Sequence, residues 1–141
     1  MTRQALSVLT LGVADLDRSR RFYKEGFGWT PVFGNEEIDF YQLNGFVFGT
    51  WLRDKLAEDM SRDAAPSGSV ALAHNVGSEE EVAPLMDRLV ASGGRLLRAA
   101  DAPVHGGFRG YVADPDGHAW EIAHNPDWPI DEDGSVRFEP A

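Results

Sequence analysis

The residues with the clearest chemical potential lie near the end of the chain, in the stretch DPDGHAWEIAHNP from Asp114 to Pro126. Its first four residues, DPDG, have the composition of a tight turn, and His118 to His124 then read as a short strand. The carboxylate of Glu121 lies in the middle of that strand, between two large apolar residues. A carboxylate in such a position needs a partner, or it acts as an acid, a base or a handle for a ligand.

The alternation of side chains along a strand predicts which way Glu121 points. Ala119 and Ala123 share its face, whereas Trp120 and Ile122 share the other. Two further predicted strands, 8–13 and 70–76, also have one bulky face and one face of smaller residues. We therefore expect helices on the bulky faces and a ligand cavity on the other, with Glu121 pointing into it. A structural alternative stays open, in which Glu121 pairs with Arg109 or Tyr111.

Other side chains could contribute to such a cavity. None of the four histidines has the spacing of a metal motif relative to another, so an exposed or packing role is favoured for each: His74, His105, His118 and His124. His105, in the loop PVHGGF, could still approach Glu121 across the cavity, and Asn75 lies on a small-residue face. Aromatic residues on predicted strands could form walls for a flat or apolar ligand, although ordinary core packing is the alternative for each: Phe40, Phe48, Trp51, Phe108 and Tyr111.

The overall composition limits the classes of function. The 141 residues are 43% hydrophobic, which suits one globular domain, and they include no cysteine for a disulfide or a thiolate metal site. The net charge of −10, from 13 basic and 23 acidic residues, argues against nucleic acid as a partner. No run approaches the roughly 18 apolar residues of a membrane span. The N-terminal stretch lacks a small-residue cleavage site before Asp15, so we expect a cytoplasmic protein.

Two segments share one layout, which predicts an internal repeat. Residues 7–29 and 69–96 each contain a short apolar strand, a helix-capping residue, an amphipathic helix and then glycine. Each is followed by further strand-like runs, predicted at 29–33, 38–43 and 46–51 in the first half and at 95–98, 107–113 and 118–123 in the second. The chain is thus predicted to form two βαβββ modules, about 5–52 and 68–124, with a linker at 53–67 and an irregular tail at 125–141.

This layout, together with DPDGHAWEIAHNP and LTLGVADLDRSRRFYKEGFGW, resembles the vicinal oxygen chelate (VOC) superfamily, which includes glyoxalase I, extradiol dioxygenases, fosfomycin resistance enzymes and bleomycin resistance proteins. The resemblance covers nearly the whole chain and implies a single VOC domain over residues 1–141. It implies an α+β fold in which the two βαβββ modules form a cup-shaped mixed β-sheet around the site, with helices outside.

The resemblance also implies where a metal would be held. Glu121 matches the family's ligand on the last strand, but the positions of two other ligands are occupied by Val8 and Ala71. His74 is near the second position with the wrong parity for the cavity face, and FVFGTWL offers no good ligand. Since catalytic sites use about three protein ligands, no conventional metal site and no cofactor are expected.

Two functions fit these observations. The first is a metal-free protein, like the family's bleomycin resistance members, that binds a small aromatic or apolar ligand in the sheet cavity. The second is a metal-dependent lyase, isomerase or dioxygenase of the glyoxalase or extradiol type, with Glu121 helped by unconventional ligands such as His74 and His105, or a metal-free enzyme that uses Glu121 for acid–base work. In either case we expect a homodimer, because the modules expose sheet edges and family members often pair.

Overall fold

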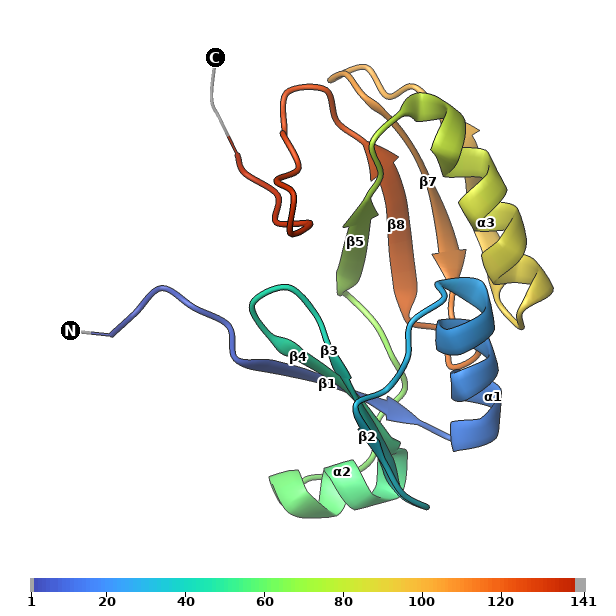
Figure 1. Ribbon diagram of the computed structural model, residues 1–141. Helices are drawn as coiled ribbons and strands as arrows, with labels where there is room; N and C mark the ends of the chain where they lie inside the picture. Colours follow the sequence, from blue (N-terminus) through green and yellow to red (C-terminus); the bar gives the residue numbers. More distant parts are fainter. Residues whose placement is uncertain (1, 139–141) are drawn as a thin grey trace.

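In the computed structural model, which describes residues 2–138, both halves of the chain have the order β-α-β-β-β (Figure 1). The first half contains β1 (Val8–Val13), α1 (Leu16–Arg20) continuing as the π-helical η1 (Arg21–Gly26), β2 (Phe33–Gly34), β3 (Ile38–Gln42) and β4 (Val47–Leu52). A linking helix, α2 (Arg53–Met60), follows. The second half contains β5 (Ala71–Asn75), the 3-10 turn η2 (Glu79–Glu81), α3 (Val82–Ala91), β6 (Arg95–Asp101), β7 (Phe108–Ala113) and β8 (Ala119–His124). The predicted α+β fold of two βαβββ units is confirmed.

Each half forms its own four-stranded mixed sheet. The strand orders are β1-β4-β3-β2 and β5-β8-β7-β6, with the first two strands of each order parallel and the others antiparallel. The predicted cup is thus divided between two sheets within one chain, and the edge strands β1 and β5 lie in different sheets. The reason is that α1, η1 and α3 pack together, and the bulky faces of both sheets turn toward them (Figure 1).

A capping side chain starts α1, and glycine follows the end of α3. The side chain of Asp15 caps α1 by accepting the N–H groups of Asp17 (2.9 Å) and Arg18 (3.2 Å). The apolar side of the amphipathic helix predicted within residues 69–96 is buried in α3 at four positions, Val82, Leu85, Met86 and Leu89. After α3 only glycine fits at position 94, since a Cβ there would lie 2.7 Å from the Phe22 ring. No helix within residues 2–138 is long and apolar enough to cross a membrane.

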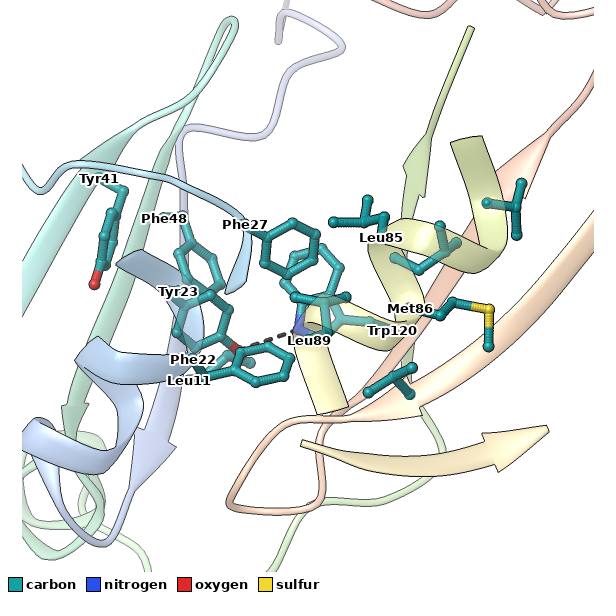
Figure 2. Packing of buried hydrophobic residues seen from close by; sticks show 13 residues of the cluster. Leu11, Phe22, Tyr23, Phe27, Tyr41, Phe48, Leu85, Met86, Leu89 and Trp120 are labelled. Carbon is teal, nitrogen blue, oxygen red and sulfur yellow. Dashed lines mark hydrogen bonds between the residues drawn. The ribbon is translucent and has the colours of Figure 1, made fainter. Parts of the chain in front are cut away.

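The hydrophobic core lies between the two halves and joins them (Figure 2). At its centre the ring of Tyr23 lies 5.0 Å from that of Phe48 in the first sheet and 6.1 Å from that of Trp120 in the second. The hydroxyl of Tyr23 donates to Asp114 (2.7 Å) and accepts the indole N–H of Trp120 (3.1 Å). Trp120 and Ile122 are buried in this core, so their predicted side of β8 is confirmed.

One predicted strand is largely absent from the structure. Residues 29–33 are predicted as the second strand, but the observed strand β2 contains only Phe33–Gly34. One further hydrogen bond to β3 runs from the N–H of Val32 to the carbonyl of Phe40 (2.8 Å). The backbone N–H of Trp29 instead donates to the carbonyl of Tyr23 (3.0 Å), and Pro31 has no N–H for a ladder. The Trp29 ring consequently stacks on Phe27, with the ring centroids 4.3 Å apart.

Candidate functional site

The DPDG turn fixes where β8 begins. The Oδ1 atom of Asp114 accepts the backbone N–H groups of Asp116 and His118, both at 2.9 Å. Gly117 has a φ of +90°, a conformation that glycine adopts without steric cost. Asp114 is only 3% exposed, and burial raises the pKa of its carboxyl. The turn is therefore held by buried contacts rather than by solvent-exposed ones.

The same turn connects the second sheet to the first half of the chain. Oδ1 of Asp116 accepts the backbone N–H of Ala14 (2.8 Å) and the guanidinium of Arg18 (2.9 Å). Nε2 of His118 donates to the carbonyl of Gly12 (2.9 Å). These contacts hold the start of β8 against the junction between β1 and α1, and so orient the strand that carries Glu121.

The register of β8 determines which way Glu121 points. Glu121 is paired with Ala73 of β5 and with Tyr111 of β7, and paired residues share a face. This is the face away from α3, opposite the buried Trp120 (Figure 1). Glu121 lines a cavity of about 320 Å³ on this face, and Asn75 and His105 line the same cavity. The predicted orientation of Glu121 is thus confirmed.

The carboxylate of Glu121 is not neutralised by Arg109, the arginine that the sequence offered as its partner. Arg109 forms an ion pair with Asp101 of β6, which also accepts from Arg98 (3.1 Å). The hydrogen bond from Arg98 is the main cause that lowers the pKa of the exposed Asp101 carboxyl, and the hydrogen bond from Arg109 lowers that pKa further. Among residues 2–138 no ion pair of Glu121 is found, so its oxygens are available to a ligand.

The five aromatic residues predicted to line the cavity lie in three different regions of the fold. Tyr111 shares the face of Glu121. Phe40 and Trp51 share the corresponding outer face of the first sheet, in the other half of the chain. Phe48 is fully buried in the core, and Phe108 packs against the core from β7. Phe48 and Phe108 thus lie on the helix-facing sides of their strands and not on the face of Glu121, because side chains alternate.

The rim of the Glu121 cavity includes residues that sequence reasoning did not select. Gly106 and Gly107, in the loop before β7, line it together with Asn125 and Trp128, in the segment after β8. Gly107 has a φ of +81°, and a Cβ there would lie 2.7 Å from Oδ1 of Asn125. The pair of glycines beside His105 was the available signal, since it allows two chain segments to approach closely.

The residues of this chain do not fit the family's metal. Val8 and Ala71 have no donor atom, and His74 is paired with Ile122, so that it faces the core rather than Glu121. The His74 ring packs edge-on against Phe27, with the centroids 5.3 Å apart. Within residues 2–138 no three His, Asp or Glu side chains gather in a group able to hold a metal ion.

Comparisons with known proteins agree with this fold. The family model of the Glyoxalase/Bleomycin resistance protein/Dioxygenase superfamily matches residues 5–122. A glyoxalase-related enzyme from Fulvimarina pelagi, of known crystal structure, is 65% identical, with a TM-score of 0.96 over 98% of this chain and 100% of that one.

Two curated relatives are more distant. Metallothiol transferase FosB of Lysinibacillus sphaericus is 27% identical over 122 residues, which are 86% of this chain and 83% of the relative. A probable lactoylglutathione lyase of Vibrio parahaemolyticus is 30% identical over 121 residues, which are 82% of this chain and 86% of the relative. The chain therefore belongs to the Glyoxalase/Bleomycin resistance protein/Dioxygenase superfamily.

Proposed function

We propose that the protein binds a small aromatic or apolar molecule on the outer face of the second sheet, with Glu121 as its polar handle and without a metal. The observation that carries this proposal is a half-buried carboxylate in a cavity of about 320 Å³, without an ion-pair partner among residues 2–138. Small-molecule sites typically place a few polar groups beside an apolar surface, as Glu121, Asn75 and His105 lie beside Trp128 here.

The groups around Glu121 have distinct roles in this proposal. The carboxylate accepts an N–H or O–H of the ligand in a charge-assisted hydrogen bond. The side-chain amide of Asn75 and the imidazole of His105 add a donor or an acceptor from neighbouring segments. The phenol ring of Tyr111, paired with Glu121 across the strands, offers a flat surface beside the carboxylate.

The experiment is to identify what the protein carries from cells by native mass spectrometry and to titrate that compound by calorimetry. Glu121→Gln keeps the shape and removes the charge, so it should weaken binding about five- to 150-fold, which corresponds to about 1–3 kcal/mol. Asp87→Asn, on the helix behind the sheet, is the matched control and should leave affinity unchanged. Unchanged affinity in a folded Glu121→Gln protein would refute the site.

An enzyme is the second candidate, because the curated relatives are named as a metallothiol transferase and a lactoylglutathione lyase. In that case Glu121 would act as a ligand or a base, with His105 beside it. Elemental analysis of untagged, dialysed protein separates the two candidates. One equivalent of a divalent metal that survives dialysis and disappears in Glu121→Ala would favour the enzyme.

We also propose that a second copy of the chain covers the outer faces. Val8 and Phe33 are 49% and 52% exposed, and the edge strands β1 and β5 belong to different sheets. Exposed apolar faces and free edges favour association. Sedimentation should show a dimer at micromolar concentration, and particles of 15.5 kDa alone would contradict this.

A further inference from the structure

A second and larger cavity, of about 520 Å³, lies between the two halves of the chain. Its size is within the range of about 300–1,000 Å³ that small-molecule pockets have. Large apolar side chains from both sheets and from the segment before β2 form its walls: Leu9, Trp29, Phe48, Leu72 and Trp120. Figure 2 shows two of these, Phe48 and Trp120, which lie beside the Tyr23 ring and have their own ring centroids 6.0 Å apart.

His74 is the histidine among the described residues that line this cavity. Its ring lies 5.3 Å from Phe27 and 6.2 Å from Trp29, measured between centroids. The rings of His118 and His124 each bond to a backbone carbonyl, whereas no hydrogen bond of the His74 ring is found within residues 2–138. Burial lowers the pKa of His74, so the ring is uncharged at neutral pH and has one free acceptor nitrogen.

The C-terminal segment lies over this cavity. Ile130 and Val136 form an antiparallel bridge that makes the segment a small hairpin, and both residues line the cavity. The hairpin lies beside β5, on the side away from α3 (Figure 1). A side-chain hydrogen bond of 3.4 Å, from Asn44 to Ser135, connects it to the turn between β3 and β4.

We propose that the cavity binds a neutral, planar aromatic molecule with one hydroxyl or N–H group, which donates a hydrogen bond to His74. Aromatic walls favour a planar ring, and an acceptor among hydrocarbon groups favours a ligand with a single donor. Among the described lining residues the charged side chain is Asp133, which lies in the exposed hairpin. An anionic ligand would therefore find no positive side chain among the described residues of the cavity. Ala73 and Asn75 of β5 separate this cavity from that of Glu121, and they line both.

The probe for this proposal is 2-naphthol, compared with 2-methoxynaphthalene, which has no donor. Calorimetry on the full-length protein should show one saturable site for 2-naphthol and about tenfold weaker binding of the methyl ether. His74→Phe keeps a ring against Phe27 and removes the acceptor, so both probes should then bind equally. Asp87→Asn, on α3 and outside both cavities, should leave both affinities unchanged. A loss of the preference for 2-naphthol in His74→Phe but not in Glu121→Gln distinguishes this cavity from the site of the proposed function.

A second measurement does not depend on the folding of a variant. In NMR spectra of the wild-type protein, the imidazole signals of His74 should shift on titration with 2-naphthol, while those of His105 stay in place. The proposal is overturned if 2-naphthol shows no saturable binding, if the His105 signals shift in place of those of His74, or if the preference for 2-naphthol survives in folded His74→Phe.

Discussion

Two buried tyrosines allow one substitution to be tested in opposite environments. Tyr23 and Tyr41 are both 0% exposed. The hydroxyl of Tyr23 donates to Asp114 and accepts from the indole of Trp120, whereas that of Tyr41 has no hydrogen-bond partner within residues 2–138. Replacement by phenylalanine removes the same oxygen in each case and leaves the ring in place.

The expected magnitudes follow from what each hydroxyl leaves behind. Tyr23→Phe leaves a buried carboxyl oxygen and a buried indole N–H unsatisfied, at about 1–3 kcal/mol each, so we expect a loss of about 2–6 kcal/mol in the free energy of unfolding. The Tyr41 hydroxyl has lost its hydrogen bonds to water on folding and gains none in the protein, so Tyr41→Phe removes a group that costs stability. We therefore expect no change, or a gain of up to about 1 kcal/mol.

Thermal unfolding followed by circular dichroism, with urea titration as a second measure, is the assay. For a chain of this size a loss of about 1 kcal/mol lowers Tm by about 3–4 °C, so Tyr23→Phe should lower Tm by about 6–24 °C. Equal losses in the two variants, or the larger loss in Tyr41→Phe, would refute the reasoning. Unchanged m-values are needed for the comparison to hold.

Three further predictions use the same measurements. Asp116→Ala should destabilise by about 1–3 kcal/mol, because the buried Asp116 side chain accepts the N–H of Ala14 across the two halves; no change would mean that water replaces this contact. Trp120→Ala should destabilise by about 3–5 kcal/mol as a core truncation, whereas Glu121→Gln, one residue later on the outer face, should have little effect. Burial lowers the pKa of His74, so the midpoint of its NMR titration should lie below about 6.5. The stability that the neutral ring contributes should be lost as the pH falls from about 6.5 toward that midpoint. A midpoint above about 6.5 would contradict this prediction.

Local patterns were sufficient to predict most of the helices and strands and the two faces of β8. The alternation around Glu121 predicted that Trp120 and Ile122 would be buried, and the apolar stripe of α3 predicted its buried face. The same alternation could have placed Phe108 in the core, because Arg109 and Tyr111 occupy the other face of β7. Phe48 was harder to place, because β4 carries large apolar residues on both faces and gives no sign of which face is inside. The C-terminal hairpin between Ile130 and Val136 was also not predicted, although its hydrogen bonds are local, such as that from the N–H of Asp131 to the carbonyl of Ser135 (2.8 Å). A single bridge between two residues leaves too short an apolar pattern to be recognised in the sequence.

The acidic residues of the DPDG turn make structural contacts, so the motif indicates the fold and does not by itself indicate a functional site. Asp114 and Asp116 are the acidic residues that make the motif recognisable, and both are used by the fold: Asp114 holds the turn and Tyr23, and Asp116 holds the N-terminus of α1. The motif therefore explains why the chain adopts this fold, and it leaves open which chemistry the fold carries. Glu121 has the opposite character, since its side chain faces away from the core and no ion pair within residues 2–138 involves it. Its substitution should change what the protein binds while the turn that positions it stays intact.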